Sequence, residues 1–364
     1  MKYYIIAGEA SGDLHGSKVM ESIKKLDKKA KFRFWGGEKM KGIGGEIVKH
    51  INQLSFMGFW EVLKNLKIIL KNISFCKSDI NTYQPDKIIY IDYPGFNMII
   101  AKWAKINGFQ NHFYISPQIW AWKESRIKKI KRYIDYLYVI LPFEKEYYKK
   151  KHDLNVHYVG HPLVEIISNE KKNKDLFPLR LTKPIIALLP GSRKQEIKKM
   201  MPVFKSVIHH FSKYEFIIAG VSNISKEWYD EILKDDRIKI VYDKTYRLLK
   251  RSTAAIVTSG TATLETALFN VPQIVCYKSS LFSYLVGKLF IKLKFISLVN
   301  IIMEREVVKE LIQKECSENN IVFELSKLLK KQNSLRVKKE YEKLRDRLGK
   351  GETSLKVAKL VTKV

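Results

Sequence analysis

Cysteine is scarce in this 364-residue sequence, and its three copies, Cys76, Cys276 and Cys316, are far apart. They form neither a C-x-x-C pair nor a metal-ligand spacing, which argues against a disulfide framework and is typical of a reducing compartment. The first residues enter a strand pattern directly, without the charged start, apolar stretch and cleavage site of a signal peptide. We therefore expect a cytoplasmic protein.

Other patterns are missing as well. The eight histidines form no H-E-x-x-H or similar cluster, so the sequence predicts no metal site. The glycines that follow the first apolar run, Gly8, Gly12 and Gly16, are spaced by four. An NAD-dependent oxidoreductase instead needs G-x-G-x-x-G and an acidic residue about 20 positions further on. The spacing therefore disfavours that class of enzyme.

Acidic residues are outnumbered: 37 Asp and Glu stand against 67 Lys and Arg, a formal net charge of +30. Compositional drift is the first interpretation, because Lys far outnumbers Arg and Ile and Asn are frequent, as expected of an AT-rich genome. Attraction to an anionic membrane surface is the second. Nucleic-acid binding comes last, because no nucleic-acid-binding motif accompanies the charge.

Apolar runs alternate with helical patterns along most of the chain, as in parallel sheets covered by helices on both faces. One series of expected strands is Tyr3–Ala7, Phe32–Trp35, Lys87–Ile91, Asn111–Ile115 and Tyr136–Ile140. A second series is Ile185–Leu189, Glu215–Ala219, Ile238–Val241, Ala254–Thr258 and Gln273–Cys276. Expected helices are Ser17–Leu26, Met98–Asn107, Ile197–Phe211 and Leu264–Phe269. The pattern predicts an α/β protein with two Rossmann-like domains.

The domains are expected at residues 1–167 and 175–331. The polar stretch Ser168–Lys174 is the predicted linker, and a charged helical segment, 332–364, is expected to pack back on the first domain. Ligands of open α/β folds bind beyond the carboxyl ends of the strands. Functional residues should therefore lie in loops that follow strands and face a cleft between the domains.

Two motifs of the first domain follow strands. The glycine-rich loop Gly8–Gly16 carries Glu9 and Asp13, which would repel a diphosphate but can accept hydrogen bonds from sugar hydroxyls; for Asp13 we favour a helix cap. Asp92 ends the strand of IIYIDYPGFN. A carboxylate there can act as a general base, and a turn-forming or N-cap aspartate is the alternative.

A motif of the second domain, ALLPGSRKQEI, joins a buried strand to a helix through Gly191, Ser192 and Arg193. Free backbone N–H groups at a helix start, a hydroxyl and a guanidinium suit a diphosphate. A tight turn with a surface arginine is the alternative interpretation.

Another motif of that domain, TSGTATLETA, has the same position after a strand. Its residues Ser259, Gly260 and Thr261 can present hydroxyls and amides at a helix N-terminus. Glu265, one turn into the helix, can accept hydrogen bonds from both hydroxyls of a ribose. Helix capping explains the motif taken alone, but together with the preceding motif it indicates a nucleotide pocket.

Aromatic and amphipathic stretches add two further hypotheses. Trp120 and Trp122 of SPQIWAW either pack in the interior or wall a sugar or acyl site. The segments 55–75 and 281–298 are apolar but studded with lysine, which argues against a spanning helix and suits an interfacial one. An ordinary core helix with a solvated edge is the alternative for each segment.

Nine stretches together carry a resemblance that covers almost the whole chain. They are GEASGD, SFMGFWEVL, YIDYPGFN, SPQIWAW, LPFEKEYY, VGHPLVE, LLPGSR, SGTATLE and SLVNIIMEREVVKELIQKEC. In this order they resemble the lipid A disaccharide synthase family, inverting glycosyltransferases of the Gram-negative outer-membrane pathway. The resemblance implies a GT-B fold with two Rossmann-like domains. It also implies a UDP-2,3-diacylglucosamine donor and a 2,3-diacylglucosamine 1-phosphate acceptor (lipid X), joined by a β-1,6 bond with release of UDP.

Roles for individual residues follow from their positions in these motifs. The resemblance makes Asp92 the general base, Arg193 a residue near the UDP phosphates and Asn300 a functionally important residue of the donor domain; Glu9 and Ser11 fall in the N-terminal motif. It implies catalysis with no cofactor and no metal, and the chain has no D-x-D motif. The partners it implies are both substrates and the phospholipid surface of the inner membrane, which the protein would bind peripherally from the cytoplasmic side. No nucleic acid is implied, and a homodimer is compatible with it.

The chain departs from the family pattern at two positions. Many members have a second acid where this chain has Gly95, and the usual proline before Asn300 is Val299. Alternative readings are another GT-B protein, such as a glycosyltransferase with undecaprenyl-linked acceptors or a UDP-sugar epimerase, and a basic membrane-bound scaffold. The scaffold reading would leave the motifs that follow the strands without a purpose.

Overall fold

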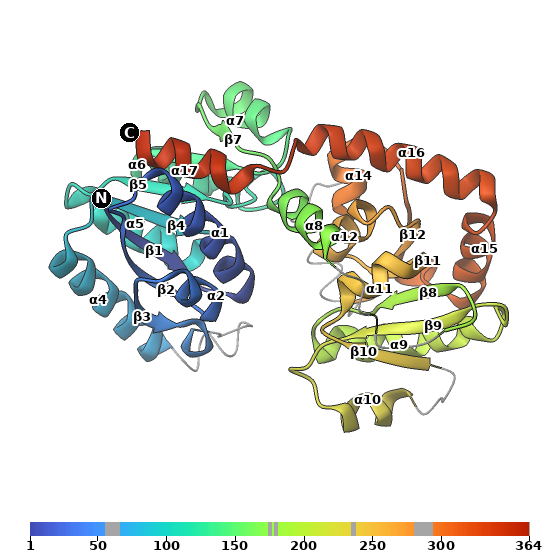
Figure 1. The fold of residues 1–364 in the computed structure, drawn as a ribbon. Coiled ribbons are helices and arrows are strands. Elements are labelled where there is room, and N and C mark those ends of the chain that lie inside the picture. The colour runs from blue at the N-terminus through green and yellow to red at the C-terminus, as the bar shows by residue number, and fades with distance from the viewer. Residues whose placement is uncertain (55–65, 174–176, 178–180, 234–237, 280–293, 364) are drawn as a thin grey trace. The chain divides into compact units, whose positions relative to one another are not determined.

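The computed structural model describes residues 1–54, 66–173, 177, 181–233, 238–279 and 294–363. The chain forms two compact α/β units (Figure 1). The first consists of Met1–Pro162 together with Lys350–Val364, and the second of Leu163–Gly349. Each unit contains one parallel sheet with its own helices, which is the α/β class that the alternating pattern predicts.

The first unit has a seven-stranded sheet in the order β3-β2-β1-β4-β5-β6-β7. Its strands are β1 (Lys2–Ala7), β2 (Lys31–Gly36), β3 (Glu46–His50), β4 (Lys87–Ile91), β5 (Asn111–Tyr114), β6 (Tyr136–Val139) and β7 (His157–Tyr158). Its helices are α1 (Ala10–Leu26), α2 (Glu38–Ile43), α4 (Leu66–Tyr83), α5 (Pro94–Ile106), α6 (Ile127–Tyr133), α7 (Glu144–His152) and α17 (Thr353–Lys363). Two 3-10 turns, η1 (Ile51–Gln53) and η2 (Glu124–Arg126), complete it.

Helices cover both faces of this sheet, which is why its central strands read as continuous apolar runs. In β1 the side chains of Tyr3 and Ile5 belong to the core beneath α1 and α17. Those of Tyr4 and Ile6 belong to the core beneath α4, α5 and α6. This alternation is the two-residue period of a strand. Because helices cover both faces of the sheet, its accessible parts are the loops at the strand ends.

The second unit has a six-stranded sheet in the order β10-β9-β8-β11-β12-β13. Its strands are β8 (Ile185–Leu189), β9 (Glu215–Gly220), β10 (Ile238–Tyr242), β11 (Ser252–Thr258), β12 (Gln273–Tyr277) and β13 (Lys309–Ile312). The helices are α8 (Pro162–Lys172), α9 (Lys194–Ile208), α10 (Lys226–Leu233), α11 (Thr245–Arg251), α12 (Thr261–Leu268), α14 (Leu298–Met303), α15 (Glu318–Leu328) and α16 (Lys331–Leu348). The 3-10 turn η3 (Gln313–Glu315) follows β13.

All of the strands expected from the sequence are confirmed, most of them to within one or two residues. The structure adds β3, β7 and β13, which the sequence did not predict. Each lies at an edge of its sheet. Edge strands need no continuous apolar run, and β7 is only two residues long, so neither strand period nor hydrophobicity marks them.

The prediction that Gly8–Gly16 forms a glycine-rich loop is wrong beyond Glu9, because α1 begins at Ala10 and includes Gly12 and Gly16. A Cβ atom at Gly12 would lie 3.1 Å from the Cβ of Ala7, and one at Gly16 would lie 2.6 Å from the sulfur of Met40. These glycines therefore allow α1 to pack closely on its neighbours. Their helix cost, about 1 kcal/mol each relative to alanine, is offset by that packing.

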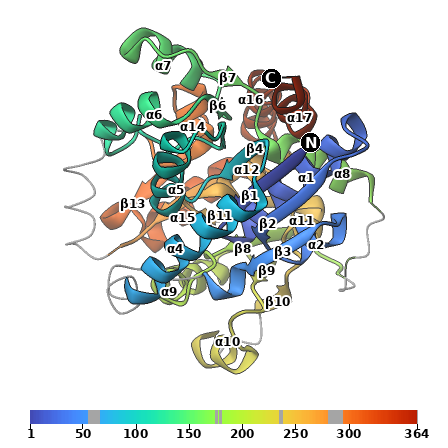
Figure 2. The same ribbon diagram turned by 90° about the vertical axis from the view of Figure 1, so that its left-hand side faces the viewer.

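The predicted linker and C-terminal segment also differ from the structure. Ser168–Lys172 continues α8, because the apolar residues on one face of this helix, Leu163, Val164 and Ile167, are buried. The segment 332–364 contains two helices with different destinations. α16 packs on α12, α14 and α15 of the second unit, whereas α17 lies beside α1 in the first (Figure 2).

The two lysine-studded segments lie largely outside the described residues, which include only 66–75 of the first and 294–298 of the second. In the described part of the first, Leu66, Ile68, Leu70 and Phe75 of α4 expose their apolar side chains. Within the described parts of the chain, every helix is too short or too polar to cross a bilayer.

Candidate active site

Asp92 directly follows β4, and Glu9 follows the neighbouring strand β1. The carboxyl ends of parallel strands meet at one sheet edge, so this pairing brings the two carboxylates together although they are distant in sequence. Both Asp92 and Tyr93 have left-handed backbones, with φ of 48° and 50°. Such conformations cost non-glycine residues about 1–3 kcal/mol each, and in proteins they gather at functional sites.

The strained turn is held from several sides. The Tyr93 ring packs over Gly8, where an added Cβ would come within 2.4 Å of it, and stacks on Phe96 with ring centroids 5.7 Å apart. The Asn97 amide donates to the Asp92 carbonyl at 2.7 Å, and the Asp92 N–H donates to the carbonyl of β5 residue Tyr114 at 2.9 Å. Gly8 is thus explained by the close approach of a ring that belongs to the Asp92 turn.

The pKa of Asp92 is raised to about 6; burial is the larger cause, the nearby charge of Glu9 adds to it, and a hydrogen bond from the Tyr93 N–H partly opposes both. Glu9 is the N-cap residue of α1, but its side chain makes no capping hydrogen bond. Glu9 and Ser11 are exposed. The first unit therefore offers a carboxylate poised near neutral pH beside exposed polar groups.

Asp13 serves as a helix cap, as expected, but it caps α2 rather than its own helix. Its buried carboxylate accepts hydrogen bonds from the backbone N–H groups of Gly37, Lys39 and Met40 at 2.7, 3.1 and 3.0 Å. These donors begin α2, where backbone N–H groups have no partner within the helix. Asp13 therefore has a structural role.

Glu144 is a buried residue of this region that the sequence reasoning missed. Its carboxylate accepts hydrogen bonds from the backbone N–H groups of Ile140 and Leu141 at 3.1 and 2.8 Å. It also accepts the indole N–H of Trp120 at 3.2 Å and the hydroxyl of Ser116 at 3.3 Å. Burial raises its pKa to about 7 despite these bonds. Glu144 therefore anchors the SPQIWAW loop. The stretch LPFEKEYY, which contains Glu144, was the sequence signal that could have identified it.

In the second unit, the loop after β8 closes on itself. Gly191 has a left-handed φ of 107°, and Glu196 of α9 folds back over it. The Glu196 carboxylate accepts from the Ser192 N–H at 3.3 Å and pairs with the Arg193 guanidinium at 3.0 Å. Arg193 is the N-cap residue of α9 and its side chain is 66% exposed. The Glu196 carboxylate therefore contacts the same groups that the sequence predicts to bind an anion.

The loop after β11 lies at the same edge, because β11 pairs with β8. Gly260 is the N-cap residue of α12 and has no side chain to cap it, and Thr261 is exposed in the first turn. The Ser259 hydroxyl donates to the Ile296 carbonyl at 3.0 Å. The structure therefore brings Ser259, Gly260 and Thr261 to the sheet edge that also holds Gly191–Arg193.

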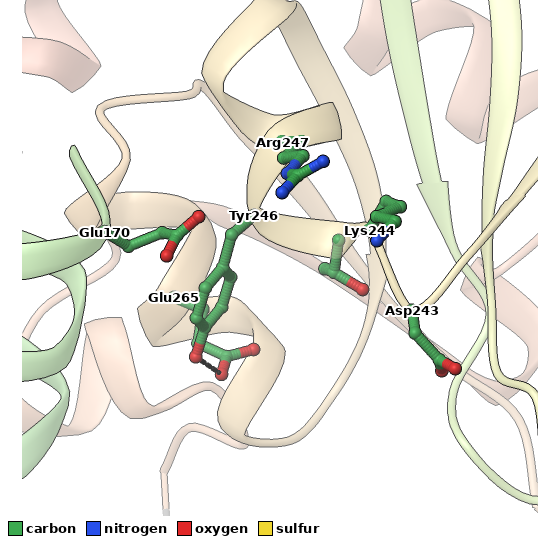
Figure 3. A pocket seen from close by; sticks show the side chains of 7 residues that line it. Glu170, Asp243, Lys244, Tyr246, Arg247 and Glu265 are labelled. Carbon is green, nitrogen blue, oxygen red and sulfur yellow. Dashed lines mark hydrogen bonds between the residues drawn. The ribbon is translucent and has the colours of Figure 1, made fainter. Parts of the chain in front are cut away.

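Glu265 lies in a pocket of about 420 Å³ (Figure 3). The pocket is lined by Glu170, Asp243, Lys244, Thr245, Tyr246, Arg247 and Glu265. The Tyr246 hydroxyl donates to the Glu265 carboxylate at 2.7 Å, and burial raises the pKa of Glu265 while this bond lowers it. Most of the lining comes from Asp243–Arg247, the turn after β10 and the start of α11. No sequence motif marks this segment.

Asn300 is buried, and all of its amide hydrogen bonds are made within the protein. Its Nδ2 donates to the Val308 carbonyl and to Glu310, both at 2.8 Å, and its Oδ1 accepts from the Val307 and Val308 N–H groups at 2.8 and 3.0 Å. Glu310 in turn accepts from the Ile296 N–H at 2.9 Å. Asn300 is thus linked through Glu310 and Ile296 to the loop of Ser259.

One group of potential metal ligands gathers among the described residues, although no sequence motif marks it. His209 and His210, at the end of α9, approach Glu318 at the start of α15, and the Nε2 atom of His210 lies 2.8 Å from the Glu318 carboxylate. Arg193 caps the other end of α9, about 22 Å away along a 15-residue helix. The group is therefore separate from the predicted site residues.

The fold and the loops at its strand ends define an α/β protein of the GT-B class, which includes glycosyltransferases and UDP-sugar epimerases. A UDP-GlcNAc 2-epimerase from Neisseria meningitidis bound to UDP-GlcNAc is similar over 100% of both chains, with a TM-score of 0.67 and 12% identity. The S. aureus MnaA–UDP co-structure is similar over 97% of this chain and 93% of that one, with a TM-score of 0.68 and 14% identity. At these identities the likeness concerns the fold alone.

Sequence comparisons narrow the class to one family. The family model for lipid-A-disaccharide synthetase matches residues 3–364. A lipid-A-disaccharide synthase of Syntrophus aciditrophicus is 36% identical over 356 residues, covering 95% of this chain and 93% of the relative. One of Coxiella burnetii is 35% identical over 365 residues, covering 98% and 96%. The chain belongs to the lipid-A-disaccharide synthase family, which confirms the resemblance seen in its motifs.

Proposed function

We propose that the protein transfers 2,3-diacylglucosamine from UDP-2,3-diacylglucosamine to 2,3-diacylglucosamine 1-phosphate. The products are the β-1,6-linked tetraacyl disaccharide 1-phosphate and UDP. Family membership supports the reaction as a whole. The observation that carries the assignment of the chemistry is Asp92, a carboxylate of raised pKa held in a strained turn at the end of a central strand.

In the proposed reaction, the Asp92 carboxylate removes the proton from the 6-hydroxyl of the acceptor. The acceptor oxygen bonds to the anomeric carbon of the donor as the bond from that carbon to UDP breaks, which inverts the anomeric configuration. A pKa of about 6 suits this task, because the group is ionised at neutral pH and is a stronger base than an ordinary aspartate. Glu9 and Ser11 are proposed to contact acceptor hydroxyls.

The second unit is proposed to bind the donor. Arg193 and the backbone N–H groups of Gly191 and Ser192 would take the diphosphate in place of the Glu196 carboxylate and stabilise the charge that develops on UDP. Glu265 would accept hydrogen bonds from ribose hydroxyls. Asn300 is proposed as a positioning residue, because its hydrogen bonds hold the segment to which the Ser259 loop is tied.

We further propose that the protein works without a metal, bound peripherally at the cytoplasmic face of the inner membrane. Both substrates carry acyl chains, and the exposed apolar residues of α4 together with the net charge of +30 support such binding. A homodimer stays a prediction.

Two substitutions test the division of roles. Asp92→Asn should lower turnover roughly 10²–10⁴-fold, the usual contribution of a general base, while UDP affinity barely changes. Arg193→Ala should weaken UDP binding roughly 10- to 150-fold, the range for a hydrogen bond to a charged group, and should lower turnover too. Calorimetric titration with UDP and a mass-spectrometric assay of the disaccharide measure both effects.

Asp153→Asn and Arg336→Ala are matched controls, because both side chains are exposed and lie in the same units as the residues they control for. Neither should change turnover or UDP affinity. If Asp92→Asn weakens UDP as much as Arg193→Ala does, the two roles are not divided between the units. A wild-type protein that forms no disaccharide would refute the proposed reaction itself.

A further inference from the structure

A cavity of about 480 Å³ lies in the first unit between α5 and α6, and we call it the α5–α6 cavity. Part of its wall is Pro94 and Gly95, which immediately continue the Asp92 turn. Apolar side chains of Met98, Ile99 and Tyr133 also line it. The volume is in the range of sites that bind small molecules, and the lining begins two residues after the proposed base.

Three cations, Lys102, Arg126 and Lys129, complete the lining, and no acidic residue is among the described residues that form it. Asp92, two residues before Pro94, does not line the cavity. The acidic residues nearest in sequence to Arg126 and Tyr133 are engaged elsewhere. Asp135 pairs with Lys105, and Glu124 pairs with Lys151. The cavity therefore combines an apolar floor with positive charge that no carboxylate in its lining offsets, so an anionic group attached to a hydrocarbon fits it.

Arg126 is held in place by the second tryptophan of SPQIWAW. Its guanidinium carbon lies 5.2 Å from the centre of the Trp122 ring, and the Lys123 ammonium lies 4.5 Å from the same ring. Such cation–π contacts orient a guanidinium without consuming its N–H donors. Burial lowers the pKa of Arg126, but an arginine stays charged at any physiological pH. The motif thus presents a fixed, charged donor group to the cavity.

We propose that the α5–α6 cavity binds the phosphate of the acceptor, with one acyl chain lying along the apolar floor. This inference rests on the proposed function, which supplies a phosphorylated acyl sugar. The acceptor is favoured over a membrane phospholipid because the cavity wall is the continuation of the turn that carries Asp92. The donor is disfavoured because its phosphates are proposed to bind in the second unit, at Arg193.

The test compares two acceptors, 2,3-diacylglucosamine 1-phosphate and the same sugar without its phosphate. Arg126→Ala and Lys129→Ala should each raise the KM of the phosphorylated acceptor roughly 10- to 150-fold, with kcat little changed. The KM of the phosphate-free acceptor should be high in the wild type and should stay the same in both variants. Lys128→Ala is the matched control, because Lys128 is exposed on the same helix and does not line the cavity.

A binding measurement separates failure of this inference from failure of the proposed function. Calorimetric titration with decyl phosphate below its micelle concentration, and with decanol for comparison, needs no turnover. Phosphate-dependent binding that Arg126→Ala abolishes and Lys128→Ala retains supports the cavity even if no disaccharide forms. Disaccharide formation with the same acceptor KM in all variants overturns the inference and leaves the proposed function intact.

The same variants identify the source of the phosphate. Sedimentation with phosphatidylglycerol vesicles is compared among Arg126→Ala, Lys129→Ala and Lys128→Ala, with thermal melting as a check that each variant is folded. If the two cavity variants lose vesicle binding while their acceptor KM is unchanged, the ligand is a membrane headgroup and the assignment to the acceptor is wrong. Equal vesicle binding in all three, with a raised KM only in the cavity variants, supports it.

Discussion

Asp92 shows how one residue acquires its chemistry from its surroundings. An aspartate after a strand is by default a turn residue, and the sequence offered that reading as the alternative. In the structure, the left-handed turn is stabilised by the packing of Tyr93 over Gly8 and by the Asn97 amide, and the partial burial of the carboxyl group makes its ionised form less favourable. Glu9 adds a second negative charge nearby. Burial and like charge both raise the pKa, so the residue remains protonated to a higher pH than an exposed aspartate.

A pH dependence follows for the reaction. If Asp92 is the base, its ionised form is the active one, so kcat/KM should fall about tenfold per pH unit below a pKa of about 6. Glu9→Gln removes the like charge and should move this acid limb to lower pH. Because burial is the larger cause, the limb should remain above the ordinary value for aspartate. Rate profiles between pH 4 and about pH 9 measure the shift.

Asp153→Asn, at an exposed carboxylate of the same unit, should leave the limb in place. An unchanged limb in Glu9→Gln would show that Glu9 does not act on the titrating group. A limb near pH 4 in the wild-type protein would show that the base is an exposed carboxylate rather than Asp92.

At the scale of elements, α17 completes the core of the first unit although it comes from the other end of the chain. Val357, Ala358 and Val361 are fully buried against a core that contains Val19 and Met20 of α1. Both helices present an apolar face at helical spacing, and these faces exclude water only when they meet. α17 therefore belongs to the unit that carries Asp92.

Removing methyl groups from α17 should loosen the first unit selectively. Val357→Ala and Val361→Ala should each lower the free energy of unfolding of that unit by about 1–3 kcal/mol, from lost burial and the cavity left behind. Hydrogen exchange should speed up in β1 and α1 and stay unchanged in β8 of the second unit. Lys356→Ala, at an exposed position of the same helix, should have little effect. Equal acceleration in both units would show that α17 does not stabilise the first one alone.

At the scale of the whole molecule, the excess of 67 basic over 37 acidic residues has two readings, compositional drift and attraction to an anionic surface. The exposure of apolar side chains bears on the attraction to an anionic surface. Leu66, Leu70 and Phe75 of α4 are about half exposed, at 49%, 57% and 46%. Apolar side chains that stay exposed on a helix, in a strongly basic protein whose proposed substrates are acylated, favour an interfacial role over drift alone.

Binding to vesicles tests that reading. The protein should sediment with phosphatidylglycerol vesicles at low salt, and binding should weaken steeply as salt is raised, because each lysine near an anionic surface contributes about 1 kcal/mol that salt screens. Leu70→Ser should weaken binding further at every salt concentration, and uncharged phosphatidylcholine vesicles should bind less. Binding that salt leaves unchanged would rule out the electrostatic part, and absence of binding would rule out the membrane role.

The amino-acid sequence alone was enough to predict the α/β class and the two series of strands. It could do so because hydrophobic period and glycine-rich turns are local properties that a short window contains. The sequence was also sufficient to identify the family, because the motifs of the family occur in order along the chain. The missed strands, β3, β7 and β13, lie at sheet edges, where only the neighbouring strand makes a short polar segment into a strand.

Which of the motif residues meet became visible only in the three-dimensional structure. Strand order places Glu9 beside Asp92, and folding of α9 turns Glu196 onto Arg193. The buried amide of Asn300 proved to hold a loop, an outcome that depends on the distant Glu310. Such pairings join segments that are far apart along the chain, and the burial that shifts a pKa exists only after those segments pack. A local sequence pattern contains neither the pairing of distant segments nor the burial of a side chain. The electrostatic environment of Asp92 could therefore be described only from the folded structure.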